Sequence, residues 1–175
     1  MRPILVLLVA RLYGVVSPAT LHAAVSLELL HNASLVHDDV VDESTERRGQ
    51  LSVNAIFNNK VAVLTGDYLL ATSLVHAELT NSHQIIRLVS SLGQDLADGE
   101  LLQLSNVSNH SFSETVYFDV IRKKTAALFA ACTEAAAYSV GVSEEEVKLA
   151  RLLGEYIGIC FQIKDDIFDY FDSKE

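Results

Sequence analysis

The sequence is poor in residues that interrupt helices. Only two prolines and eight glycines occur among its 175 residues, and tryptophan is absent. Proline and glycine mark turns most strongly, so their scarcity disfavours a fold of many short strands and tight turns. Half of the residues are hydrophobic, which is enough for a large core built from long helices. This length predicts one domain, covering residues 1–175.

Positive charge is also scarce. The formal net charge is −10, with 13 Lys and Arg residues against 23 Asp and Glu residues. A nucleic-acid partner is therefore not expected, because phosphate backbones call for a basic surface. The two cysteines, Cys132 and Cys160, lie within apolar helical patterns, and we expect both to be small buried hydrophobes rather than a disulfide.

Long charge-free apolar runs are missing as well. The N-terminal stretch MRPILVLLVARLYG lacks a small-residue cleavage site, and Arg11 interrupts it, so no secretory signal is expected. The longest nearly apolar stretch, residues 61–79, contains Asp67, His76 and Glu78, which a free-standing membrane span would not carry. We expect a buried helix there and a soluble, cytoplasmic protein without a membrane span.

Helical periodicity is present along nearly the whole chain, and no hairpin signal is evident. Ser17 and Pro18 suit a helix start, and Ser143 with Glu146 forms a capping box. A polar loop is expected over residues 44–59. The expected helices, which would form a single bundle, cover residues 18–43, 60–79, 83–106, 113–140 and 143–171.

Carboxylates are concentrated in two helical segments of D-D-x-x-D spacing. The segment HDDVVDE contains Asp38, Asp39 and Asp42, and FQIKDDIFDYF contains Asp165, Asp166 and Asp169. The first and last acids of each segment lie one turn apart and repel each other unless a cation lies between them. Oxygen ligands on helices suit Mg²⁺, whereas a calcium loop would need a central Gly. For either segment alone, a solvated acidic face is the alternative.

These segments resemble a known family. HDDVVDESTERRG is similar to the first aspartate-rich motif of the trans-type isoprenyl diphosphate synthases, or polyprenyl synthases. GDYLLA, RKKTAALF and FQIKDDIFDYF resemble further family segments in the same order. The resemblance covers essentially the whole chain and implies an all-α isoprenoid synthase fold, a bundle of long helices around a central cavity. Family members are longer, so we interpret residues 1–175 as their central portion, without the N-terminal segment and C-terminal helices.

The resemblance implies a transferase that condenses isopentenyl diphosphate head-to-tail with an allylic diphosphate. Mg²⁺, in up to three ions bound with diphosphate, would neutralise the leaving group. The metal-site candidates are Asp38, Asp39, Asp42, Asp165, Asp166 and Asp169, and which of them contact metal directly stays open. The family also implies a homodimer and a product long enough for delivery to a membrane.

The resemblance assigns the basic residues to the two substrates. Arg47 is similar to the arginine that holds the allylic diphosphate, and Arg48 to the one that holds isopentenyl diphosphate. Arg2 and His31 match further isopentenyl diphosphate ligands. An ordinary charged loop is the alternative for the arginine pair, and a packed side chain is the alternative for His31.

Three residues are expected near the reacting carbon. By resemblance, Lys124 adds a positive contact to the allylic diphosphate, and Thr125 and Gln162 offer neutral oxygens near the developing carbocation. Glu100 and Gln103 share a helix face and are expected to border the cavity. No protein base is required, because the departing diphosphate can accept the final proton.

Product length is expected to depend on the helix that carries Asp38. The hydrocarbon tail would run towards the N-terminal end of this helix, past Ser34, Ala33 and Leu30. Short-product family members place an aromatic ring at one of these positions, and residues 33 and 34 are small here. The two-residue spacing between the second and third acids of the first motif also favours a medium or long all-trans product of octaprenyl-like length. Close helix packing is the alternative explanation for the small residues.

The alternative function is a non-catalytic subunit or an inactive fragment of a heteromeric prenyl synthase. The intact aspartate motifs disfavour it, because a purely structural partner has no use for six acids set in a helical core.

Overall fold

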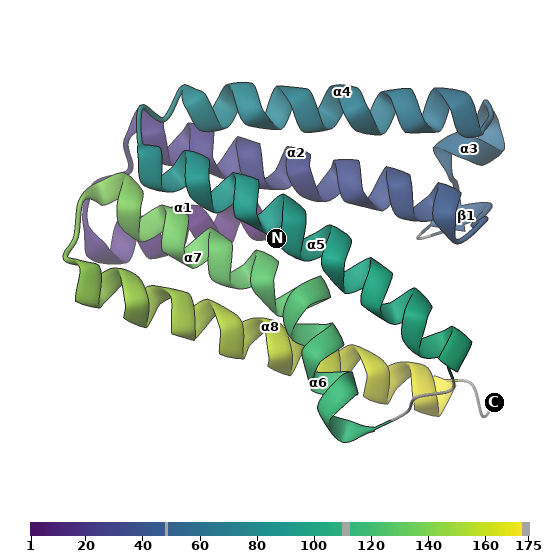
Figure 1. Ribbon diagram of the computed structural model, residues 1–175. Coiled ribbons are helices and arrows are strands. Elements are labelled where there is room, and N and C mark those ends of the chain that lie inside the picture. Colours follow the sequence, from purple (N-terminus) through teal and green to yellow (C-terminus); the bar gives the residue numbers. More distant parts are fainter. Residues whose placement is uncertain (48, 110–112, 173–175) are drawn as a thin grey trace.

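The computed structural model describes residues 1–47, 49–109 and 113–172, and most of them are helical. The helices are α1 (Arg2–Tyr13), α2 (Pro18–Val41), α3 (Val53–Ile56), α4 (Asn59–Glu78), α5 (His83–Asn109), α6 (Glu114–Ile121), the π-helix η1 (Arg122–Ala126), α7 (Ala127–Val140) and α8 (Glu144–Asp172). The expected all-α bundle is confirmed (Figure 1).

The expectation of no hairpin is wrong. Two short antiparallel strands, β1 (Glu46–Arg47) and β2 (Gln50–Leu51), lie between α2 and α3. Gly49 has a φ of 75°, which a residue without a Cβ adopts easily, and this allows the chain to reverse. The strands are too short for side-chain alternation to reveal them in the sequence.

The hydrophobic core lies where α1, α2, α5 and α7 pack together (Figure 1). Fully or nearly fully buried side chains come from all four helices, including Val6, Ala10, Leu27, Ile85, Val89, Leu128, Cys132 and Ala136. One face of the N-terminal apolar stretch, with Val6, Val9 and Ala10, is therefore part of the core, whereas Leu8 and Leu12 on α1 are exposed. Cys132 is buried as expected, and its burial raises the thiol pKa to about 12. Cys160 is exposed, so the expectation of burial is wrong for that residue.

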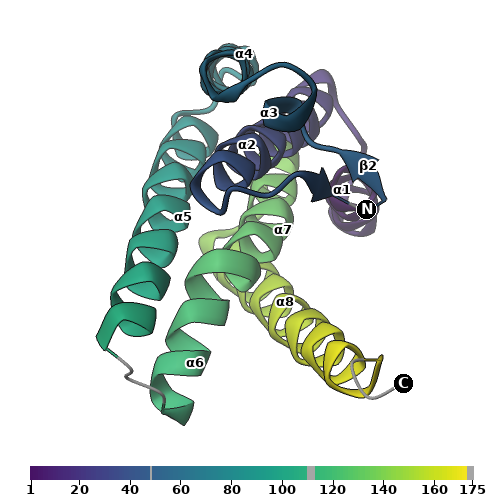
Figure 2. The same cartoon turned by 90° about the vertical axis from the view of Figure 1, so that its right-hand side faces the viewer.

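Helix α4 lies beside α2 on the outside of the bundle (Figure 2). The expectation of a buried helix at residues 61–79 is wrong, because only one stripe of α4 is covered, comprising Ala62, Gly66, Ser73 and Ala77. Leu64 and Tyr68 are 68% and 72% exposed. In the part of the chain that the structure describes, no helix is long and apolar enough to cross a membrane.

Two glycines allow α8 to approach the helix that precedes it. A Cβ at Gly158 would lie 2.5 Å from the Cα of Ala126, and one at Gly154 would overlap the Thr133 side chain. This close approach brings the C-terminal half of α8 beside η1. The C-terminal halves of α2, α5 and α8 consequently lie at the same end of the bundle as η1 (right-hand side of Figure 1).

Candidate active site

The middle acid of the first aspartate segment is bound by an arginine of the hairpin. Arg47 donates from Nε to Oδ1 of Asp39 at 2.8 Å, and its Nη2 lies 2.7 Å from the same oxygen in an ion pair. The Asp39 side chain is only 6% exposed, whereas that of Arg47 is 34% exposed. The carboxylate of Asp39 is therefore engaged by protein, and the guanidinium is fixed at the edge of the site.

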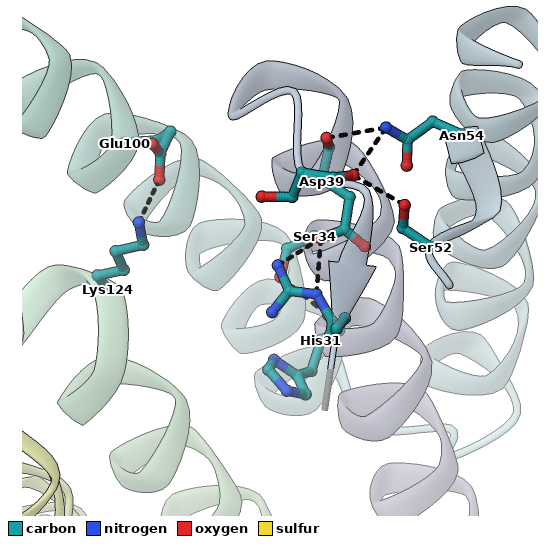
Figure 3. Close-up of polar contacts among 9 residues, drawn as sticks. His31, Ser34, Asp39, Ser52, Asn54, Glu100 and Lys124 are labelled. Atoms are coloured by element: carbon teal, nitrogen blue, oxygen red, sulfur yellow. Dashed lines mark hydrogen bonds and ion pairs between the residues drawn. The ribbon is translucent and has the colours of Figure 1, made fainter. Parts of the chain in front are cut away.

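The loop that follows this segment is held by side chain–backbone hydrogen bonds (Figure 3). Asn54 donates from Nδ2 to the carbonyl oxygens of Asp39 and Ser44, at 3.2 and 3.0 Å. Ser52 donates to the Ser44 carbonyl at 2.8 Å. These contacts tie the end of α2 to α3 and set the position of the hairpin that carries Arg47.

Asp38 lies among charges from several elements. Burial raises the pKa of its carboxyl group, and the negative charges of Glu100 and Asp42 raise it further, while Lys124 and Arg47 lower it. Asp42, the C-cap residue of α2, is exposed. The carboxylate of Asp38 is thus only partly compensated by the cations of the protein, and it would gain stability from a nearby metal ion.

Lys124 is oriented from η1 towards α5. Its Nζ lies 2.7 Å from Oε2 of Glu100 (Figure 3). The same Nζ donates to Oε1 of Gln103 at 3.0 Å. The other carboxylate oxygen of Glu100 is buried, and none of the residues that the structure describes forms a hydrogen bond with it. The expectation of one helix from 113 to 140 missed η1, and π-helical turns of this kind are frequent at functional sites.

The second aspartate segment is joined to α6 and η1 by a series of hydrogen bonds. Thr125 donates to Oε1 of Gln162 at 2.7 Å, and Nε2 of Gln162 donates to Oδ1 of Asp166 at 2.8 Å. Oδ2 of Asp166 accepts a hydrogen bond from the Tyr117 hydroxyl. This bond, followed by burial, raises the pKa of Tyr117 to about 12. Asp165 and Asp169 are exposed.

Four further candidates lie on α2: Leu30, His31, Ala33 and Ser34. His31 is 8% exposed, and Leu30 and Ala33 are 3% and 2% exposed. Ser34 is half-buried and donates from Oγ to the His31 carbonyl at 2.9 Å. The expected roles of His31 in substrate binding and of Leu30, Ala33 and Ser34 in product length stay predictions.

The two remaining basic candidates differ in what the structure describes. The guanidinium of Arg2 lies 5.9 Å from the ring centroid of Phe129 on α7. Arg48 lies outside the described residues. The proposed contacts of both arginines with isopentenyl diphosphate stay predictions.

The acids present fit Mg²⁺ bound together with a diphosphate. Among the described residues, no three His, Cys, Asp or Glu side chains are grouped closely enough to hold a metal by themselves. Mg²⁺ does not need such a group, because it keeps several waters and takes one or two carboxylates plus substrate phosphate. The desolvated Asp38 beside the exposed Asp42, both oxygen donors, meets that requirement.

Sequence reasoning missed the contacts of Tyr117 and of Asn54. Tyr117 lies two helical turns before Lys124, a spacing that places both residues near one face of a helix. That spacing could have identified Tyr117 as a neighbour of the site. No sequence signal marks the side chain of Asn54, whose partners are backbone carbonyls of another segment.

Comparison with known proteins extends these observations. The profile of the polyprenyl synthetase family matches residues 1–175. The octaprenyl diphosphate synthase of Haemophilus influenzae is 39% identical over 169 residues, which are 97% of this chain and 51% of that protein. The chain thus spans about half the length of the curated relatives it matches.

Solved structures agree with this family assignment. The crystal structure of geranylgeranyl pyrophosphate synthase from Bacteroides thetaiotaomicron is 82% identical, with a TM-score of 0.87, over 99% of this chain and 54% of that one. Polyprenyl synthase from Caulobacter crescentus, complexed with calcium and isoprenyl diphosphate, is 37% identical with a TM-score of 0.92, over 97% of this chain and 52% of that one. The isoprenoid synthase fold expected from the sequence is thereby confirmed.

Proposed function

The chain belongs to the polyprenyl synthetase family, and from this we propose that it contributes the metal and allylic diphosphate site of a prenyltransferase. The reaction would condense isopentenyl diphosphate head-to-tail with an allylic diphosphate. The observation that carries the proposal is that the acids within each aspartate segment have different surroundings. Asp39 and Asp166 are bound to protein donors, whereas a desolvated Asp38 and the exposed Asp42, Asp165 and Asp169 are available to cations.

Asp38, Asp42, Asp165 and Asp169 are the residues that would hold Mg²⁺ with the diphosphate. When bound, Mg²⁺ supplies Lewis-acid stabilisation of the negative charge that grows on the leaving diphosphate. The solved relative from Caulobacter crescentus, complexed with calcium and isoprenyl diphosphate, supports a cation and a diphosphate as ligands.

The residues of the chain bind and orient the allylic substrate. Arg47, fixed by Asp39, presents the remainder of its guanidinium fork to diphosphate oxygens. Lys124 adds positive charge from η1, where Glu100 and Gln103 limit its conformations. These cations favour departure of the diphosphate because they stabilise its growing charge in a preorganised site.

Neutral groups face the developing carbocation in this proposal. Thr125 and Gln162 are hydrogen-bonded to each other, so their oxygens are held in place as dipoles. Such dipoles can stabilise a cation without capturing it as a strong nucleophile would. Because the departing diphosphate accepts the final proton, none of these residues has to act as a base.

Two product lengths have support. The small residues Ala33 and Ser34 favour a medium or long product, and the name of the Haemophilus influenzae relative agrees with an octaprenyl length. The Bacteroides thetaiotaomicron relative, at 82% identity, is named for a geranylgeranyl product. Sizing the extracted product by chromatography decides between the two.

A homodimer is the proposed assembly, and α4 offers a surface for it. Leu64, Tyr68 and Val75 on that helix are 68%, 72% and 57% exposed. Sedimentation of the chain, compared with Tyr68→Glu, tests the assembly: a single-chain mass for the unmodified chain contradicts it. A non-catalytic subunit of a heteromeric synthase stays the alternative function.

The deciding experiment measures turnover and metal binding together. Asp38→Ala and Asp165→Ala are expected to remove most prenyl transfer and most Mn²⁺ binding in the presence of inorganic diphosphate, while circular dichroism shows intact helices. Asp98→Ala is the control, because that acid is exposed on α5. Unchanged metal binding in both Asp variants contradicts the proposal. If the unmodified chain binds metal but neither it nor a longer form of the protein transfers prenyl groups, the subunit alternative is favoured.

A further inference from the structure

Tyr117 is a residue that neither the sequence motifs nor the proposed mechanism uses. It lies on α6, and its hydroxyl donates to Oδ2 of Asp166 on α8. The other oxygen of the same carboxylate accepts Nε2 of Gln162 at 2.8 Å. Each oxygen of the Asp166 carboxylate therefore accepts a hydrogen bond from a different protein donor.

The contacts continue beyond Asp166 to η1. Oε1 of Gln162 accepts a hydrogen bond from Thr125 at 2.7 Å. The C-terminal half of α8 is thus hydrogen-bonded to the helical segment that runs through α6 and η1 at both Tyr117 and Thr125. Lys124, adjacent to Thr125, is held in turn by Glu100 on α5.

We propose that Tyr117 is a positioning residue of the metal site, which acts by fixing the carboxylate of Asp166 and thereby the turn of α8 that carries Asp165 and Asp169. This inference rests on the proposed function. Substitution of a residue that orients the carboxylates of a metal site typically lowers the metal affinity strongly, although that residue does not touch the ion.

The geometry gives a physical reason for this role. Asp165, Asp166 and Asp169 place three negative charges within one helical turn, and a mobile Asp166 would compete for the cation in varying geometries. Two donors restrict Asp166 to one orientation. The same donors link its position to η1, so the acids of α8 and the ammonium group of Lys124 are set in relation to each other.

A merely structural role for Tyr117 makes a different prediction. The residue is 38% exposed, so removing its hydroxyl leaves no large buried defect. A positioning role therefore requires a large change in metal binding together with a small change in thermal stability. A structural role requires a large fall in thermal stability and only a small change in metal binding.

The test uses Tyr117→Phe, which removes one oxygen and retains the ring. Binding of Mn²⁺ in the presence of inorganic diphosphate is followed by electron paramagnetic resonance of the free ion. We expect the affinity of the variant to fall about tenfold, with the melting temperature in the absence of metal nearly unchanged. Tyr156→Phe is the matched control, because Tyr156 lies on α8 and is 59% exposed, and it is expected to bind Mn²⁺ as the unmodified chain does.

A second pair of variants tests whether Tyr117 acts through Asp166. In the Asp166→Asn background, Tyr117→Phe is expected to cause little further loss of Mn²⁺ affinity, since the carboxylate it orients is gone. Additive losses would contradict action through Asp166.

The outcomes separate this inference from the proposed function. If the unmodified chain binds Mn²⁺ with diphosphate and Tyr117→Phe binds it equally well, the positioning role is wrong and the proposed function stands. Loss of affinity accompanied by a large fall in melting temperature also overturns the positioning role. If the unmodified chain binds no Mn²⁺ with diphosphate, the proposed metal site is wrong and this inference falls with it.

Discussion

Asp39 and Asp166 occupy the same position in the two D-D-x-x-D segments, and both are bound by donors of the protein. Asp39 accepts a hydrogen bond from Nε of Arg47 and forms an ion pair with its guanidinium. Asp166 accepts one from Tyr117 and one from Gln162. The two segments thus share more than their spacing. In each, the second acid connects its helix to a neighbouring element, and the outer acids are the proposed cation ligands.

The pairing of Asp39 with Arg47 predicts a stability effect. Arg47→Ala leaves a carboxylate that is 6% exposed without its strongest donor. We expect the free energy of unfolding to fall by about 2 kcal/mol, the usual range for an unsatisfied buried acceptor. Chemical denaturation measures this value.

An exposed arginine provides the control for Arg47. Arg122 pairs with Asp119 and Glu155 at 3.8 and 3.7 Å, and its side chain is 53% exposed. Arg122→Ala is expected to cost less than about 1 kcal/mol. Equal losses for the two variants would show that the Asp39 pair is no stronger than a surface contact.

The raised pKa of Asp38 predicts a pH-dependent effect on stability. Because the pKa of the folded state lies above the unfolded value of 3.8, the folded chain binds this proton more tightly. The contribution of Asp38 to stability therefore decreases as the pH rises from 3.8 through the higher pKa of the folded state. Asp38→Asn is expected to raise the melting temperature of the metal-free chain at pH 7, and this gain should shrink as the pH falls towards 3.8.

The control for this prediction is Asp98→Asn, at an exposed position on α5. This substitution should change the melting temperature by a small amount that is similar at pH 7 and at a pH near 3.8. A lower melting temperature for Asp38→Asn at pH 7 would mean that the carboxylate supports the fold, contrary to its desolvation.

The close approach of α8 to η1 predicts that Gly158 cannot be enlarged. In Gly158→Ala the new Cβ would lie 2.5 Å from the Cα of Ala126 and 3.2 Å from the Cβ of Phe129. Backbone atoms cannot yield as a side chain can, so we expect a loss of about 1–3 kcal/mol from overpacking. Thermal unfolding measures the change.

Gly93→Ala is the matched control, because the new Cβ would lie 3.9 Å from Cδ1 of Leu30, an ordinary van der Waals contact. This variant adds helix propensity without a clash, and a gain of about 0.4–1 kcal/mol is expected. Similar effects of both substitutions would show that α8 is not closely packed against η1.

Much of this fold follows from local patterns, and the exceptions have physical causes. The helix start at Ser17 was predictable because the capping box is local: the Ser17 and Thr20 side chains bond each other's backbone N–H groups. The exposure of Cys160 and of α4 was not, because an apolar pattern does not reveal which neighbour covers it. Helix α4 carries apolar residues on all sides, yet only one stripe contacts α2.

The candidate site likewise has features that local sequence patterns predict and features that depend on tertiary packing. The acids could be identified from their spacing, because helical periodicity fixes which of them share a face. Their protein partners could not. Arg47 reaches Asp39 through a hairpin, and Tyr117 reaches Asp166 across a sequence separation of 49 residues. Such pairings depend on tertiary packing.

The last prediction concerns product length and distinguishes two neighbouring positions on α2. Ala33 is 2% exposed, so Ala33→Phe would have to displace packed neighbours. Ser34 is half-buried, and its hydroxyl donates to the His31 carbonyl of its own helix. Ser34→Phe can therefore introduce a ring at lower cost to the fold, and it is the sharper test of the tail's path.

We expect Ser34→Phe to shorten the product by several isoprene units while the rate of the first condensation is retained, because the substitution leaves the acids untouched. Chromatography of the extracted products measures the length. Val25→Phe is the control, since Val25 lies on α2 and is 40% exposed, away from the proposed path. If Ser34→Phe remains active and gives the product length of the unmodified protein, the tail does not pass this residue, and the small side chains of α2 serve helix packing instead.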